Sequence, residues 1–144
     1  KTNILVKCSN GHKSYFTNFD RFKRGDRCPY CNESKGEREI NEILNKYNIK
    51  FKAQYKFNDC KFKHILSFDF YLPQHNCCIE FDGQQHFEII EWFGGFDGFV
   101  EGKIRDTIKN IYCKNNGIKL IRIPYYDLNK IEEILNKELK LNKI

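Results

Sequence analysis

The segment spanning residues 65–82 constrains the fold of this chain more than any other. Two apolar runs, residues 65–72 and 77–81, flank the four residues Pro73-Gln74-His75-Asn76. The linking residues favour a turn, and the runs are rich in the aromatic and β-branched residues that favour strands. The segment therefore predicts an antiparallel β-hairpin with a four-residue loop.

Three carboxylates interrupt this hairpin. Counting back from its loop places Asp69 directly opposite Glu80, and the alternation of side chains along a strand places Asp82 on the face of Glu80. Because opposed like charges destabilise a sheet, we expect this face to bind a hard divalent cation, Mg²⁺ or Mn²⁺. In the competing interpretation, Asp69 is a buried acid that pairs with a Lys or Arg, such as Lys63 or Arg122.

Length and composition indicate a globular, cytoplasmic protein. The chain has 144 residues, 40% of them apolar, which is enough for one compact domain with a small appendage. No apolar run approaches the roughly 20 residues of a membrane span, and no signal peptide opens the chain. Seven cysteines, an odd number, argue against a disulfide framework and for a reducing environment. Because the sequence opens on Lys1 and contains no Met, we expect a piece of a longer polypeptide.

The net charge of +6 is concentrated near the N-terminus. Residues 1–35 hold eight Lys and Arg against three Asp and Glu, a balance of +5, whereas residues 36–144 hold 17 against 16, or +1. A basic segment of this kind suits a polyanion, and DNA is the expected partner.

Residues 1–34 are predicted to form a small zinc-ribbon-like module. The pattern C-x3-H-x15-C-x2-C places two candidate ligands on each of two tight turns, as a closed tetrahedral zinc site requires. The segment is too short to bury a core of its own, so structural Zn²⁺ would stabilise it directly. The histidine is the one ligand that a surface position also explains. The predicted zinc ligands are Cys8, His12, Cys28 and Cys31.

Basic and aromatic residues alternate between the two turns of this module. Such a mixture suits contact with phosphates and bases, although the aromatic residues are equally explained as a miniature core. The predicted DNA-binding residues here are Arg21, Lys23, Arg24 and Arg27, beside Tyr15, Phe16, Phe19 and Phe22.

A helix is predicted over residues 35–48. Ser34 and Glu37 have the spacing of a capping box, and apolar residues follow at helical intervals. Glu37 lies near the edge of the apolar face, so it is explained either as part of the cap or as a fourth acid delivered to the hairpin.

The remaining pattern completes a mixed α/β domain. Residues 51–57 alternate as a half-buried strand and Asn58-Asp59 is expected to turn the chain into the hairpin. Residues 88–101, rich in glycine and aromatic residues, are expected to form a loop, either a flap over substrate or an ordinary connection. A helix over 103–116, a strand over 118–123 and a final helix capped by Asp127 follow.

The second half of the hairpin offers groups for phosphodiester chemistry. A divalent cation can stabilise the charge that develops in a phosphodiester displacement and lower the pKa of the attacking water. His86, just beyond the strand that carries Asp82, is placed for proton transfer, and Lys109 is a candidate for phosphate contact.

These segments resemble a known family. Ser67–Pro73 and Ile79–His86 look like the catalytic hairpin of the PD-(D/E)XK nucleases, in the branch of the very-short-patch repair endonuclease and the EDxHD homing endonucleases. Ile104–Ile123, an Arg-Asp helix leading into a strand, is similar to the same branch, and the resemblance covers roughly residues 35–137.

The resemblance implies a restriction-endonuclease-like core over residues 35–144, with the order αβββαβα and a mixed sheet flanked by helices. It also implies Mg²⁺-dependent cleavage of DNA, gripped in part by the zinc module. The chain departs from the family where Asp82 stands in place of a lysine, a role left to His86 or Lys109. The implied catalytic residues are Glu37, Asp69, Glu80, Asp82, His86 and Asp106, with Asp69, Glu80 and Asp82 as the Mg²⁺ ligands.

Two other functions compete with the nuclease. The core could position DNA for another domain without cleaving it, or it could be a structural protein whose acids bind Ca²⁺ or pair with lysines. Dimerisation and further domains of a longer chain stay open.

Overall fold

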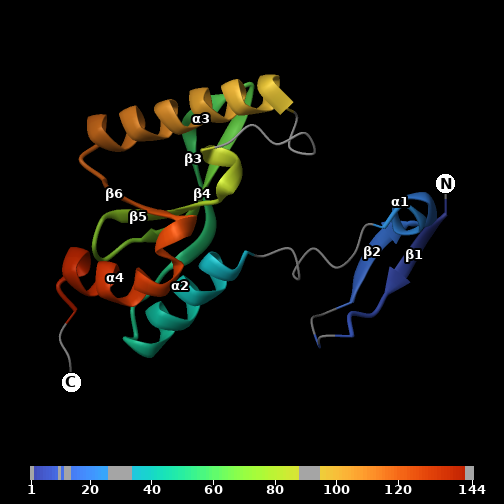
Figure 1. Ribbon diagram of the computed structural model, residues 1–144, viewed down its shortest axis with the longest axis horizontal. Coiled ribbons are helices and arrows are strands. Elements are labelled where there is room, and N and C mark those ends of the chain that lie inside the picture. The colour runs from blue at the N-terminus through green and yellow to red at the C-terminus, as the bar shows by residue number, and fades with distance from the viewer. Residues whose placement is uncertain (1, 10, 12–13, 26–33, 88–94, 142–144) are drawn as a thin grey trace.

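The computed structural model describes residues 2–9, 11, 14–25, 34–87 and 95–141. Two sheets are present in this part of the chain, a two-stranded one near the N-terminus and a four-stranded one in the core (Figure 1). The elements are β1 Asn3–Val6, β2 Tyr15–Asn18, α1 Phe19–Lys23, α2 Lys35–Lys46, β3 Lys52–Phe62, β4 His64–Leu72, β5 Cys77–Asp82, η1 Gln84–His86, α3 Gly95–Asn115, β6 Lys119–Pro124, η3 Tyr125–Lys130 and α4 Ile131–Leu139.

The core sheet is mixed and has the strand order β3-β4-β5-β6. The first two pairings are antiparallel, and β5 and β6 run parallel. Parallel neighbours need a crossover, and α3 lies in the connection between β5 and β6. The expected mixed α/β fold, with a mixed sheet flanked by helices, is therefore confirmed.

Helices cover both faces of this sheet. Figure 1 shows α3 on one side and α2 with α4 on the other. The larger apolar cluster joins α2, α4 and the sheet, with Leu44, Ile79 and Leu135 fully buried. The smaller cluster lies under α3 and includes Phe68 and Cys113. Two cores on one sheet leave its central strand enclosed on both faces.

Strand β5 shows this enclosure directly. Cys77 belongs to the cluster under α2 and α4, whereas Cys78 belongs to the cluster under α3, and neither is exposed. The two cysteines therefore face opposite sides of the sheet, as expected for neighbours on a strand. A strand buried on both faces also explains why its sequence is a nearly continuous apolar run.

Most elements of the core lie where the sequence predicts them. The capped helix is α2, and the side chain of Ser34 accepts a hydrogen bond of 3.1 Å from the backbone N–H of Glu37. The predicted hairpin is β4 and β5, in which Leu72 pairs with Cys77. The last predicted strand is β6, and Gly117 ends the preceding helix with a φ of +67°.

Three predicted boundaries are wrong. Asn58 and Asp59 do not turn the chain, because β3 continues to Phe62 and the turn falls at Lys63, whose φ is +61°. Residues 95–101 are not a loop, because α3 already begins at Gly95. Asp127 does not cap the final helix: it lies within η3 in a non-helical conformation, and Lys130 occupies the N-cap position of α4.

The N-terminal unit is a small antiparallel hairpin with one short helix. Leu5 pairs with Phe16, and the side chain of Asn18 caps α1 by accepting a hydrogen bond of 2.8 Å from the backbone N–H of Arg21. No helix within the described residues is long and apolar enough to cross a membrane.

Candidate active site

Strands β4 and β5 separate at the acids of the hairpin. Their last backbone pair is Phe70 with Ile79, and the same register places Asp69 opposite Glu80, as predicted. Beyond that pair, the backbone N–H of Asp69 donates to Oε1 of Glu80 at 2.9 Å, and the N–H of Phe81 donates to Oδ2 of Asp69 at 2.8 Å. At this point carboxylate oxygens, and not backbone carbonyl oxygens, accept the backbone N–H groups that would otherwise join the two strands.

The side chains of β4 change phase at the same point. Phe68 packs in the cluster under α3, whereas Phe70, two residues later, packs in the cluster under α2 and α4. Regular alternation would put both on one face. The irregularity at Asp69 directs its carboxylate toward β5, where Oδ2 accepts the N–H of Phe81.

Glu37 lies near this gap, in the first turn of α2. Gly36 packs so closely on Phe81 that a Cβ at this position would overlap the aromatic ring. This contact fixes the start of α2 against the end of β5. The charge of Glu37 is one of the causes that raise the pKa of Asp69, which places Glu37 near the opposed pair.

The Asp69 carboxyl is strongly perturbed. Burial raises its pKa, and the charges of Glu80 and Glu37 raise it further, to about 7, against the smaller opposing effects of the Phe81 N–H and Lys109. Within the described residues, no donor reaches its second oxygen, Oδ1. A buried carboxyl that shares a gap with two other acids is stabilised in its ionised form by a bound cation.

Lys109 on α3 provides the cation nearest to this pair. Its Nζ lies 3.1 Å from Oε2 of Glu80 and 5.3 Å from the centre of the Phe68 ring, and both charged side chains are nearly buried. A lysine from α3 thus balances the charge of Glu80. Lys109 belongs to this site and not to an exposed surface.

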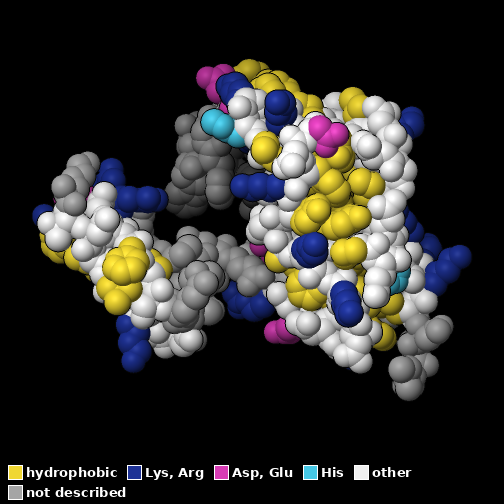
Figure 2. Space-filling view, turned by 180° about the vertical axis from the view of Figure 1, so that it is seen from behind, with side chains coloured by type: hydrophobic (Ala, Val, Ile, Leu, Met, Phe, Trp, Pro, Cys, Tyr) yellow, Lys and Arg dark blue, Asp and Glu magenta, His cyan; other side chains and the backbone are white. Residues whose placement is uncertain are grey.

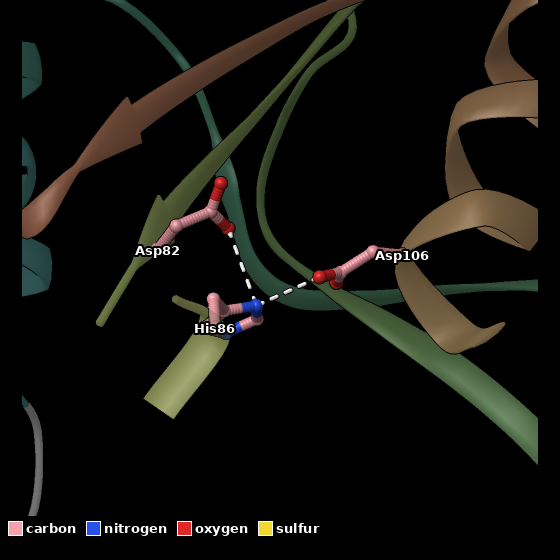
Figure 3. A group of neighbouring side chains, drawn as sticks. All are labelled: Asp82, His86 and Asp106. Carbon is pink, nitrogen blue, oxygen red and sulfur yellow. Dashed lines mark hydrogen bonds and ion pairs between the residues drawn. The ribbon is translucent and has the colours of Figure 1, made fainter. Parts of the chain in front are cut away.

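A second group lies beside the first. Asp82 at the end of β5, His86 in η1 and Asp106 in α3 converge, and both carboxylates point toward Nδ1 of the histidine (Figure 3). Nδ1 lies 2.8 Å from Oδ2 of Asp106 and 3.8 Å from Oδ1 of Asp82. Among the described residues, only these three bring metal-ligating atoms within 4.8 Å of one another.

Arg122 of β6 balances the charge of this second group. Its guanidinium donates to Oδ1 of Asp82 at 2.8 Å and lies 3.7 Å from Oδ1 of Asp106. The pairing of Asp69 with Lys63 or Arg122 is therefore wrong, because Lys63 binds Glu101 at 2.7 Å and Arg122 binds Asp82.

The hydrogen bond between His86 and Asp106 shifts both groups toward their charged forms. The bond and the charge of Asp106 raise the pKa of His86 above its ordinary value, although burial opposes this. For Asp106, burial raises the pKa, but the His86 bond together with the charges of His86 and Arg122 outweighs it and lowers the pKa overall. Burial is the largest effect on Asp82 and raises its pKa despite Arg122. Nδ1 is held by Asp106, and Nε2 has no partner among the described residues, so it is the nitrogen available for other chemistry.

The predicted catalytic residues therefore lie in two adjacent groups. Asp69, Glu80 and Glu37 form the first and Asp82, His86 and Asp106 the second, so Asp82 does not join Asp69 and Glu80 in one ligand set. Sequence reasoning missed the roles of Gly36 and Arg122. The glycine directly before Glu37 was the available signal for a close contact, whereas the position of Arg122 depends on the parallel pairing of β5 and β6, which the sequence does not show.

Most of the zinc prediction lies outside the described residues. Cys8 is buried, and the N–H of Gly11 donates to its carbonyl at 3.2 Å in a tight turn. His12, Cys28 and Cys31 are not among the described residues, so the zinc site stays a prediction, as does the boundary of the module.

The basic residues of the N-terminal unit are displayed on its surface. Arg21, Lys23 and Arg24 are exposed, and Arg27 lies outside the described residues. Phe16 and Phe19 are 74% and 55% exposed, so these two aromatic side chains do not form a miniature core.

The comparisons with known proteins identify a viral family. The chain is 33% identical to uncharacterized protein 094L of Frog virus 3 over 117 residues, which cover 74% of this chain and 72% of that protein, and it belongs to the same family. It is also 33% identical over 61 residues to uncharacterized protein 307L of Invertebrate iridescent virus 6, of which it covers 31%. No family model and no solved structure matches the chain.

Proposed function

We propose that this protein is a metal-dependent DNA endonuclease with a restriction-endonuclease-like core. The observation that carries the proposal is the Asp69 carboxyl, whose pKa is raised to about 7 by burial and by the neighbouring Glu80 and Glu37. Perturbed acids of this kind are typical of functional sites. The resemblance of the hairpin to PD-(D/E)XK nucleases gives the same position the central role.

The donor set around Asp69 fits a hard divalent cation. Its groups are carboxylates, which suit Mg²⁺ and Mn²⁺, and the free oxygen of Asp69 leaves a coordinating position. Asp69 and Glu80 would hold the ion, with Glu37 close enough to contribute charge. Bound there, the ion would stabilise negative charge on a phosphate and activate water.

His86 is suited to transfer a proton. Its hydrogen bond of 2.8 Å to Asp106 fixes the orientation of the ring and favours the protonated form. An imidazolium held in this way can donate a proton from Nε2 to a leaving oxygen or bind a phosphate oxygen. Arg122 keeps Asp82 and Asp106 in place, so it acts as a positioning residue.

The N-terminal unit is proposed to grip DNA. Its exposed Arg21, Lys23 and Arg24 suit phosphate contact, and exposed Phe16 offers a surface for a base or sugar. The viral origin of the relatives fits an enzyme that acts on DNA inside a host cell.

Cleavage of a panel of DNA substrates tests this proposal. Labelled duplex, single-stranded and branched DNA would be incubated with the protein in Mg²⁺, in Mn²⁺ and in EDTA. We expect cleavage of at least one substrate that requires the metal. Its absence on all three, with protein that binds DNA, would reject the endonuclease.

A DNA-binding module without catalysis is the second candidate. The ion pairs of Lys109 with Glu80 and of Arg122 with Asp82 favour it, because they already offset two of the acids. This candidate predicts DNA binding that is unaffected by divalent cations and no cleavage in the same panel.

A further inference from the structure

The core is nearly neutral overall, but one edge of its sheet is basic. Residues 50–64 hold five lysines against one acid, a balance of +4 with histidine neutral, whereas residues 36–144 together reach only +1. Most of these lysines lie on β3, the edge strand of the core sheet. We call Lys52, Lys56 and Lys61, which are all exposed, the β3 lysines.

Among the described residues, the β3 lysines have no acidic partner within 4.0 Å. The neighbouring Lys63 is paired with Glu101, and the one acid of β3, Asp59, accepts a hydrogen bond of 2.7 Å from the Tyr112 hydroxyl. Lys109 and Lys119 of the core are paired with acids, whereas Lys114, Lys130 and Lys137, like the β3 lysines, have no acid within 4.0 Å among the described residues. The positive charge of the β3 edge is therefore left for an external anion. Lys and Arg side chains also stand among hydrophobic ones over the core face drawn in Figure 2.

This edge runs past the candidate metal site. The pairs Ala53 with Phe70 and Tyr55 with Phe68 place Gln54 directly opposite Asp69. Lys52 and Lys56 lie two residues to either side of Gln54, so their Cα atoms are about 8 Å from that of Asp69 by strand geometry. Lys52 pairs with Tyr71 and Lys56 with Ser67, on either side of the phase change at Asp69, so the two lysines start on opposite faces of the sheet and flank Asp69 from both.

The backbone of β3 is irregular where it faces Asp69. Gln54 has a φ of +50°, a left-handed conformation that is uncommon for a residue other than glycine. Its side-chain oxygen accepts a hydrogen bond of 3.3 Å from the hydroxyl of Ser67 on β4. Such strained residues concentrate at functional sites, and this one lies opposite Asp69, where the side chains of β4 change from one face of the sheet to the other.

A groove adjoins the start of the same edge. It has a volume of about 850 Å³, and its lining is mixed: Ile49, Phe51 and Pro73 are apolar, whereas Asn45, Asn48, Lys50, Lys52 and Gln74 bring polar groups. Ammonium and amide groups are donors suited to phosphate and sugar oxygens. The basic character therefore extends from this groove along β3 toward Gln54.

We propose that the β3 edge binds the sugar-phosphate backbone of the DNA strand presented to Asp69. The inference rests on the proposed function and adds a second DNA-contact surface, on the core and separate from the N-terminal unit. The competing explanation is that lysines on an edge strand only prevent pairing with other sheets, a common protective device. If the β3 edge binds DNA, the β3 lysines contribute more to DNA affinity than other exposed lysines of the core do. If they only protect the edge, they contribute no more.

A charge-matched comparison separates them. The triple variant Lys52→Gln/Lys56→Gln/Lys61→Gln and the control Lys114→Gln/Lys130→Gln/Lys137→Gln, whose lysines are exposed on α3, η3 and α4, lose the same charge. Duplex binding would be measured without added Mg²⁺ or Mn²⁺ and without chelator, over a series of salt concentrations. The logarithm of the binding constant falls as the logarithm of the salt concentration rises, and each lost phosphate contact makes this slope less steep by about 0.9. We expect the β3 variant to lose about two to three such units and at least tenfold in affinity, and the control to stay near wild type.

Equal losses in the two variants, or no loss in either, would overturn the inference. Because the measurement needs no cleavage, failure of this inference can be distinguished from failure of the proposed function. If the wild type cleaves DNA with metal but the two triple variants bind DNA equally well, the proposed nuclease function is retained and the role of the β3 edge is rejected. Absence of DNA binding by the wild type would reject both. Wild-type thermal stability of each variant would confirm that the comparison reports on folded protein.

Discussion

The backbone N–H of Asp69 donates a hydrogen bond of 2.9 Å to Oε1 of Glu80, so two acids meet where the ladder of β4 and β5 ends. Each acid accepts a backbone N–H from the opposite strand, and only Glu80 has a lysine on its other oxygen. The pair is therefore built into the sheet, yet it remains incompletely neutralised.

Removing the charge of Asp69 should stabilise the metal-free protein. Its pKa rises from 3.8 to about 7 on folding, so the folded state takes up a proton between these values. The resulting stability is fully present below about pH 4 and is lost as the pH rises through 7. At pH 8 in EDTA, Asp69→Asn should raise the free energy of unfolding by on the order of 2 kcal/mol. Urea denaturation at pH 8 and pH 5 measures this, and a destabilised variant at pH 8 would contradict the pKa shift.

Lys109 should be essential to the stability of the pair. Its side chain and that of Glu80 are 12% and 4% exposed, so Lys109→Met leaves a buried carboxylate unpaired, which typically costs about 3 kcal/mol. Lys119→Met is the matched control, because its pair with Glu138 is 49% and 38% exposed and should contribute less than about 1 kcal/mol. Similar losses in the two variants would show that the Lys109 pair is not buried in solution.

The histidine should titrate above its ordinary range because of Asp106. NMR titration of His86 should give a pKa above 6.5, and Asp106→Asn should lower it, since the charged hydrogen-bond partner is lost. The limb of the pH–rate profile that depends on protonated His86 should move to lower pH in the same variant. An unchanged His86 pKa in Asp106→Asn would exclude the dyad.

Gly36 should resist a substitution that usually stabilises helices. Alanine within a helix is normally favoured by about 0.5–1 kcal/mol, but a Cβ at Gly36 would overlap the Phe81 ring. Gly36→Ala should therefore destabilise the protein by about 1–3 kcal/mol. Gly102→Ala in α3 is the control, because the nearest atom, Nη2 of Arg105, lies 3.8 Å from the added Cβ. Thermal denaturation should separate the two, and stabilisation by both substitutions would contradict the contact.

The sequence predicted local structure better than long-range contacts. The register that opposes Asp69 and Glu80 followed from the apolar runs and the short loop between them, both of which are local. The turn at Asn58-Asp59 was wrong because turn-forming residues were outweighed by packing: Phe57, Cys60 and Phe62 continue the strand over the cluster under α3. The start of α3 at Gly95 was missed because glycine disfavours helices.

The division of the acids into two groups could not be predicted from the sequence, because it depends on contacts between residues far apart in the chain. Asp82 shares a face with Glu80, as predicted, but its partner is Arg122 on a parallel strand that enters through a helical crossover. Pairing of that kind leaves no signal in residue spacing. The capping position of Glu37 is a local feature and was predicted, whereas its place near the site was implied by the family resemblance and not by residue spacing.

Metal-dependent cleavage of supercoiled plasmid DNA tests the central claim most directly. The assay compares wild type with Asp69→Asn, in Mg²⁺ and in Mn²⁺, and uses Asp97→Asn in the first turn of α3 as a control that removes one exposed charge. We predict nicked or linear product with wild type and with the control, and a loss of at least a hundredfold with Asp69→Asn, which keeps its fold. Equal activity in Asp69→Asn and wild type, or no activity in either, would contradict the assignment of this site.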